Sequence, residues 1–131
     1  MKVFIALTIA AIAFTGCKKD KSSGEDHTFE GTITVTAPAE GAVINGGTSF
    51  QVQAAITGNM EMHGYQLSVF KQADDALVFT HEEHDHATSF SINETVTHTL
   101  SDTTLLRLEI TAAGDHEGST VTKTVSFTYV P

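Results

Sequence analysis

Apolar and polar residues alternate along most of the chain after residue 28. Between residues 29 and 36, the odd-numbered positions are Phe29, Gly31, Ile33 and Val35, and the even-numbered positions are mainly threonines. A period of two places alternate side chains on opposite faces of a strand, so the segment is predicted to be a β-strand with one buried face. Similar apolar rows recur at 50–56, 65–69, 77–79, 90–96, 106–112 and 125–129.

Turn-forming residues separate these rows. Pro38 to Gly41, Asn45 to Gly47 and Gln72 to Asp75 have turn chemistry, and Gly58-Asn59 is expected to end the second strand. About seven short strands, with turn signals roughly every 8–12 residues and no helical spacing, predict an antiparallel β-sandwich.

The N-terminal segment follows a different pattern. Met1-Lys2 is basic, and Val3 to Phe14 is an apolar run with one threonine. Such a run is too short to span a bilayer as a helix, so it predicts an export signal rather than an anchor.

This segment ends in Phe14-Thr15-Gly16-Cys17. The ending resembles the lipobox of bacterial lipoproteins, although Phe14 and Thr15 depart from the commoner residues. The resemblance implies a signal peptide over residues 1–16, cleavage before Cys17, and attachment of diacylglycerol and a fatty acyl chain to Cys17. The alternative is an ordinary secretory signal with a chance free thiol.

Residues 18–27 contain no apolar side chain, so residues 17–28 are predicted to be a flexible tether and residues 29–131 the folded domain. Lysine after Cys17 and the charged stretch resemble the tethers of Bacteroidota-type lipoproteins. That resemblance implies the cell envelope, most simply the outer membrane, and leaves open its periplasmic face or the cell surface.

The C-terminal part also resembles a known class of domain. From Ala112 to Tyr129 an apolar strand, Asp115, Gly118 and a final alternating strand follow one another. This order is similar to the end of bacterial immunoglobulin-like and fibronectin-III-like modules, and Pro38 to Gly47 resembles their first turn. The chain thus resembles small immunoglobulin-like bacterial lipoproteins of unknown function, which implies a fold but no catalytic residues.

Charge and composition exclude several kinds of partner. The chain has 7 Lys and Arg against 16 Asp and Glu, a net charge of −9, and cleavage of the leader with Lys2 makes it more negative. This charge opposes binding to nucleic acid and favours cations or basic partners. One Cys and no Trp exclude a disulfide scaffold.

Histidines and carboxylates concentrate between His81 and His86. If consecutive strands alternate in direction, this stretch, the loop at 58–63 and the loop at 114–119 lie at one end of the sandwich. Imidazole is a common ligand of Cu²⁺ and Zn²⁺, and carboxylates can complete the shell. We therefore predict a copper or zinc site whose candidate ligands are His63, His81, His84, His86 and His116. In a strand His84 and His86 point the same way, so they are the predicted central ligands, whereas His81 points oppositely and could join only through a bend.

Other interpretations of these residues remain open. The stretch could be a solvated hairpin tip that blunts a sheet edge, or a loop whose charge changes on protonation near neutral pH. Met60 and Met62 are either soft ligands or core residues. His98 is in register with Val96 and Leu100, and is predicted to face the core.

Catalytic signatures are lacking. No Ser lies in a nucleophile elbow, no Gly-rich loop precedes a helix, and Asp74-Asp75 is explained by a turn at the opposite end from the histidines. The sequence therefore predicts a lipid-anchored binding or accessory module of the envelope rather than an enzyme. The alternative is a metal-free module that contacts an envelope protein or a glycan.

Overall fold

The computed structural model describes residues 28–114 and 118–131. The predicted signal peptide, Cys17, nearly all of the tether and His116 lie outside these ranges. Within them, no helix is long and apolar enough to cross a membrane.

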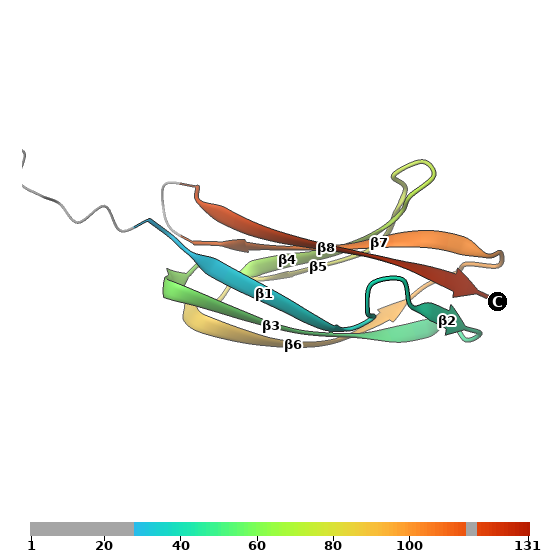
Figure 1. Cartoon of the computed structure of the whole chain (residues 1–131), viewed down its shortest axis with the longest axis horizontal. Helices are drawn as coiled ribbons and strands as arrows, with labels where there is room; N and C mark the ends of the chain where they lie inside the picture. Colours follow the sequence, from blue (N-terminus) through green and yellow to red (C-terminus); the bar gives the residue numbers. More distant parts are fainter. Residues whose placement is uncertain (1–27, 115–117) are drawn as a thin grey trace, which may run out of the picture.

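The described residues form two β-sheets (Figure 1). One has the strand order β1-β3-β6 and the other β2-β8-β7-β4-β5. Every neighbouring pair is antiparallel except β2 and β8, which are parallel. The strands are β1 (Gly31–Ala37), β2 (Val43–Asn45), β3 (Ser49–Met62), β4 (Tyr65–Lys71), β5 (Leu77–Glu83), β6 (Ala87–Thr97), β7 (Thr104–Ala113) and β8 (Thr120–Val130).

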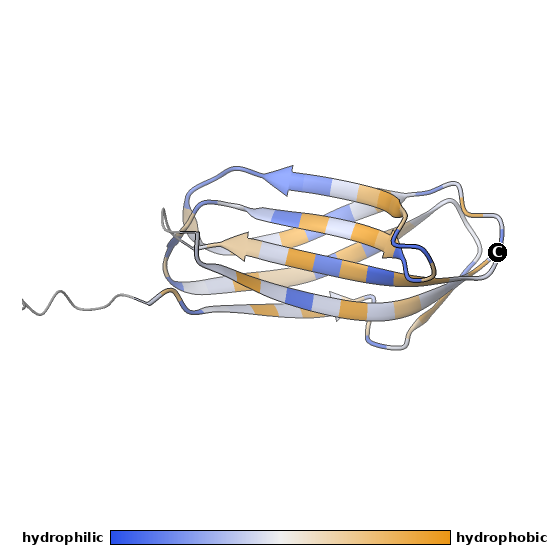
Figure 2. Cartoon of the chain, turned by 90° about the horizontal axis from the view of Figure 1, so that it is seen from above, coloured by the Kyte–Doolittle hydropathy of each residue, from blue (hydrophilic) through white to orange (hydrophobic). Residues whose placement is uncertain are grey.

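The two sheets pack face to face, and the predicted apolar rows form the layer between them. Figure 2 shows the alternation of hydrophobic and hydrophilic residues along single strands. Ile56, Leu67, Leu108 and Ile110 have no exposed surface. Burial of such side chains contributes about 1.5–3 kcal/mol each. The predicted all-β, immunoglobulin-like sandwich is confirmed.

One strand was not predicted. After β1 the chain leaves the three-stranded sheet, and β2 then pairs with β8 in the other sheet. The amides of Gly41 and Gly46 donate to the carbonyls of Ser126 (2.7 Å) and Val130 (2.7 Å). β2 is only three residues long and Val43 is exposed, so its placement depends on β8 rather than on its own hydrophobic pattern.

The predicted break at Gly58-Asn59 is wrong, because β3 continues to Met62. The Asn59 side chain accepts a hydrogen bond from the Glu30 amide (2.9 Å) and donates one to the Thr28 carbonyl (2.9 Å). Glycine at position 58 leaves room for the buried Phe29 ring. These two residues therefore hold the start of the domain instead of ending the strand.

Candidate functional site

Three loops meet at the end of the sandwich where β1 begins. The His63 amide donates to the Ala113 carbonyl (2.9 Å), and the Ala113 amide donates to the Gly64 carbonyl (3.1 Å). On the other side, Tyr65 at the start of β4 pairs with Glu83 at the end of β5. The loops after β3, β5 and β7 therefore lie at the same end, as the alternation of strand direction predicts.

Gly64 lets two of these loops approach closely. Its φ angle is +112°, a conformation that side chains other than glycine rarely adopt. A Cβ atom at this position would collide with the Glu83 carbonyl oxygen and lie 3.2 Å from the His84 Cα. The absence of a side chain at Gly64 thus allows the β3–β4 loop to lie against the β5–β6 loop.

Two of the described candidate ligands, His63 and His86, are in direct contact. Their rings are in edge-to-face contact, with centroids 4.4 Å apart. His86 Nδ1 lies 3.2 Å from Glu61 Oε1, and its backbone amide donates to Asp85 Oδ1 (2.8 Å). Glu61 near the end of β3, His63 just after it and His86 in the β5–β6 loop therefore form one group, which we call the His63–His86 cluster.

His84 has a different carboxylate partner. Its Nε2 lies 3.3 Å from Glu82 Oε2, and the histidine side chain is 82% exposed. An ion pair this exposed contributes little stability. Together with His63, Gln66 and Thr111, this pair lines a shallow depression of about 180 Å³ on the outer side of the sheet.

His81 points between the sheets. It pairs across the strands with the buried Leu67, and residues directly opposite each other share a face. Its Nε2 lies 3.6 Å from Glu94 Oε1, which belongs to β6 in the other sheet. Inward-pointing polar groups of this kind protect the free edges of a sandwich from pairing with other chains.

Tyr65 lies beside this pair. Its ring is in edge-to-face contact with Phe90, with centroids 5.3 Å apart, and lies 6.2 Å from the His81 ring. Burial raises the pKa of the Tyr65 hydroxyl, and the negative charges of Glu94 and Glu83 raise it further. The phenolate is therefore disfavoured in the folded domain.

Alkaline pH should destabilise the domain partly through Tyr65. Below the ordinary tyrosine pKa of 10.0 the group is neutral in both states. Above it, the unfolded chain loses a proton that the folded domain retains, so the free energy of unfolding falls until the raised pKa is passed. Tyr65→Phe should reduce the fall measured by urea unfolding between about pH 8 and pH 11. Equal falls in both proteins would contradict this assignment.

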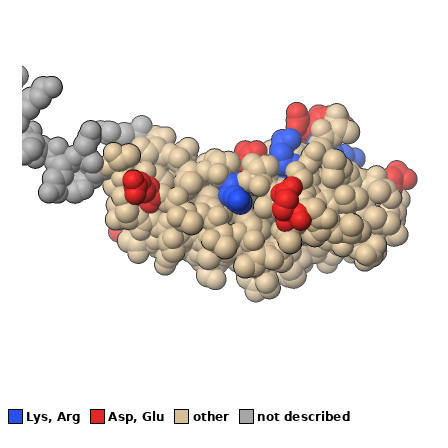
Figure 3. All heavy atoms as spheres, viewed as in Figure 1, with Lys and Arg blue, Asp and Glu red and all other residues tan. Residues whose placement is uncertain are grey.

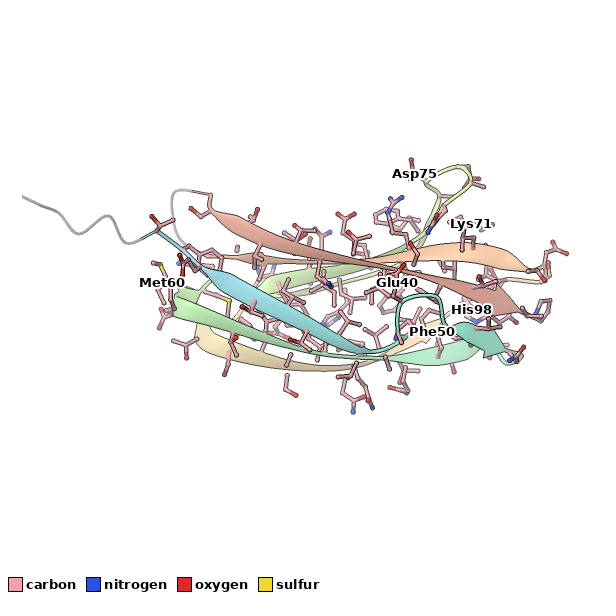
Figure 4. The ribbon with its side chains drawn as sticks, in the orientation of Figure 1. Glu40, Phe50, Met60, Lys71, Asp75 and His98 are labelled. Carbon is pink, nitrogen blue, oxygen red and sulfur yellow. The ribbon has the colours of Figure 1, made fainter. Side chains whose placement is uncertain are left out.

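Two predictions concerned the opposite end of the sandwich, where Figure 4 labels His98 and Asp75. His98 is buried between Phe50 and Tyr129, with ring centroids 5.8 and 4.5 Å away, so its core-facing placement is confirmed. Its Nδ1 accepts a hydrogen bond from the Leu100 amide (3.2 Å), while Nε2 is buried without a partner among the described residues. Asp75 follows β4 and pairs with Arg107 (2.8 Å), at the opposite end from the His63–His86 cluster.

The three histidines of the stretch from His81 to His86 each lie beside a different carboxylate. His81 pairs with Glu94, His84 with Glu82, and His86 with Glu61. Among the histidines that the structure describes, His63 and His86 are in contact with each other through their rings, and His116 lies outside the described residues. Within residues 28–114 and 118–131, no group of three His, Cys, Asp or Glu side chains is arranged to hold a metal ion. The ligand set therefore stays a prediction.

Sequence reasoning missed Glu61 as a partner and Gly64 as the contact that joins the loops. Met62 is fully buried, which explains it as a core residue, and Met60 packs against the core. The sequence feature that could have identified Glu61 is its odd-numbered position, because alternate residues of β3 face outward and Glu61 continues this row beyond Thr57. That signal becomes readable only once β3 is known to extend to Met62.

Comparison with known proteins finds similarity among solved structures. The sequence matches no family model and no curated protein. Among solved structures, the chain is similar to the fibronectin(III)-like modules of Clostridium thermocellum CbhA, with 11% identity and a TM-score of 0.49. The match covers 76% of this chain and 96% of the other. A similarity at this level adds nothing to the strand order described above.

Proposed function

We propose that the chain is a lipid-anchored, non-catalytic module of the cell envelope that binds a copper or zinc ion at its loop end. The observation that carries the proposal is the contact between the rings of His63 and His86. The Glu61 carboxylate lies beside the His86 ring. The two imidazoles come from different loops, so the folded domain holds them together. A site assembled before the ion arrives needs little rearrangement on binding.

Glu61 would set the tautomer of His86. A proton on Nδ1, donated to the carboxylate, leaves the Nε2 lone pair for the metal. Carboxylate partners of this kind orient metal-binding histidines and increase their basicity. His116, on the loop between Gly114 and Gly118, is the candidate third ligand. His81 and His84, which the sequence also offers as ligands, would have to leave their own carboxylates, so the proposed site does not need them.

The lipid anchor places this end of the domain toward the membrane. The described chain enters β1 at the end where the three loops meet (Figure 1). With Cys17 held by its acyl chains, residues 18–27 would act as a flexible spacer on the order of 15–20 Å long. Two or more acyl chains make such an attachment stable.

Metal binding is tested with soluble protein of residues 18–131. Titration calorimetry with Cu²⁺ and Zn²⁺ should give a Kd below about 1 µM for one of the ions, equivalent to roughly −8 kcal/mol. Removing a ligand should weaken binding at least about tenfold, so His63→Ala and His86→Ala should each do so, and Glu61→Gln should cost about 10–100-fold.

His84→Ala is the matched control. It removes a histidine of the same stretch that is more exposed than His86 (82% against 57%) and contacts Glu82 rather than His63. Its Kd should stay within about threefold of the parent protein. Equal, weak binding by the parent and by the His63→Ala/His86→Ala double variant would show that the histidines bind ions only adventitiously, and the metal proposal would fail.

A further inference from the structure

The outer face of the three-stranded sheet carries no charged side chain between its two ends. The outward-facing positions of β1, β3 and β6 are all exposed, and they alternate with the core positions. We call this surface the neutral face; it consists of Thr32, Thr34, Thr36, Ser49, Gln51, Gln53, Ala55, Thr57, Ser89, Ser91, Asn93, Thr95 and Thr97. Glu30, just before β1, and Glu61, near the end of β3, lie beyond this face, and Glu94 on β6 points inward.

The opposite sheet differs. Its outer face carries Glu82, Arg107 and Glu109, and the adjoining β4–β5 turn carries Asp74 and Asp75. In Figure 3 the charged residues gather toward the β7–β8 side and this turn, while the margin formed by β3 and β6 is largely without colour. A chain of net charge −9 therefore keeps one broad face electrically neutral.

This face is hollowed at its centre. Ala55 lies between Thr34 on β1 and Ser91 on β6 in the register of the sheet. Because its side chain is a methyl group, the longer side chains of Thr36, Gln53 and Asn93 surround a depression of about 310 Å³. Within the described residues the side chains of Thr34, Ser91 and Asn93 make no hydrogen bond, so their donors and acceptors are directed to solvent.

Part of the surface is ordered by its own hydrogen bonds. Gln51 Nε2 donates to the Thr95 hydroxyl (2.6 Å), and the Thr36 hydroxyl donates to the Gln53 carbonyl (3.1 Å). Threonine is also stiff at χ1, so a threonine-rich face loses less side-chain entropy on binding than one made of Lys or Glu. The neutral face is therefore a relatively preorganised set of hydroxyl and amide groups.

We propose that the neutral face binds an uncharged glycan, independently of the His63–His86 cluster. A polyanion would find no cation there, and a protein partner would find none of the aromatic, Arg or large apolar residues that dominate protein interfaces. The hydroxyls and amides each donate and accept hydrogen bonds, as the hydroxyls of a neutral sugar do. The net charge of −9 makes two copies of the domain repel each other, whereas a neutral, hydroxyl-rich polymer meets no such repulsion.

The test is an NMR titration of ¹⁵N-labelled residues 18–131 with two neutral polymers, dextran and laminarin, and with anionic alginate. We expect amide shifts on β1, β3 and β6 with at least one neutral polymer and none with alginate. Ala55→Arg fills the depression with a long charged side chain and should abolish these shifts, and Ser91→Asp, at the margin of the depression, should weaken them. Thr124→Arg makes the same charge change on the outer face of the other sheet and should leave them unchanged.

Several results would overturn the proposal. They are a lack of shifts with both neutral polymers, equal shifts in the Ala55→Arg protein, or a preference for alginate. Shifts of the same amides that depend on protein concentration without any polymer would instead identify a second copy of the chain as the occupant. Metal titration of the Ala55→Arg protein should remain that of the parent, which separates this proposal from the metal site.

Discussion

Gly64→Ala is expected to lower the free energy of unfolding by about 3 kcal/mol, which combines backbone strain with a forced contact. Alanine would have to adopt the φ angle of +112° while its Cβ collides with the Glu83 carbonyl oxygen. Neither partner yields easily, because both belong to backbone at the ends of hydrogen-bonded strands. The melting temperature should fall on the order of 15 °C in a domain of this size.

Gly41→Ala is the matched control for this substitution. Gly41 also has a positive φ angle, +74°, but a Cβ there would meet no atom within 4 Å. Gly41→Ala should therefore lower the free energy of unfolding through backbone strain alone, by about 1 kcal/mol. Thermal unfolding of both variants separates the two effects. If Gly64→Ala is no more destabilising than Gly41→Ala, the close approach of the two loops is not required by the fold.

The Gly64→Ala substitution also tests the metal proposal. Relief of the collision would move the β3–β4 loop away from the β5–β6 loop, and His63 would move away from His86. Any Gly64→Ala protein that remains folded should then bind Cu²⁺ or Zn²⁺ more weakly, although it keeps every candidate ligand. This result would link the affinity to the geometry of the loops rather than to the number of histidines.

Cys17→Ser is expected to release the protein from the membrane when the full chain is expressed in a lipoprotein-processing bacterium. Serine cannot form the thioether to diacylglycerol, so the acyl chains that hold the protein are lost. Membrane and soluble fractions are compared by immunoblotting, and labelling with a palmitate analogue reports the modification directly. The parent should be labelled and sediment with membranes, whereas the variant should be unlabelled and either soluble or retained as an uncleaved precursor.

Lys18→Ser is the control, because it changes the neighbouring tether residue and keeps the thiol. It should remain labelled and membrane-bound. If the Cys17→Ser protein is processed and stays on the membrane as firmly as the parent, the lipobox interpretation is wrong, and the segment is an ordinary secretory signal. The sandwich has its own core in residues 29–131, so loss of the anchor should not change its thermal unfolding.

The two proposed binding surfaces have different physical characters. The His63–His86 cluster is small and places imidazoles beside a carboxylate. The neutral face is broad and has no charge. Under the two proposals, the module holds an ion at the loop end and a glycan along one sheet, and the variants above remove either function separately.

The histidine-rich stretch shows how strand geometry overrides proximity in sequence. His81 lies within β5, and alternation turns it inward to Glu94. β5 ends at Glu83, so His84 and His86 are free of that alternation, and each lies beside a different carboxylate. The prediction that His84 and His86 point the same way in a strand is therefore wrong, because β5 ends before both residues.

The sequence by itself determined the fold class, the seven longer strands, the shared end of the three loops and the inward placement of His98. All of these follow from the period of two and from alternating strand direction, which are local properties of the chain. The tertiary structure decided the pairing of β2 with β8, the extension of β3 to Met62, and the partner of each histidine. These features depend on residues distant in sequence, such as Ser126 for Gly41 and Glu61 for His86, and alternation in one segment carries no information about which distant residue will lie beside it.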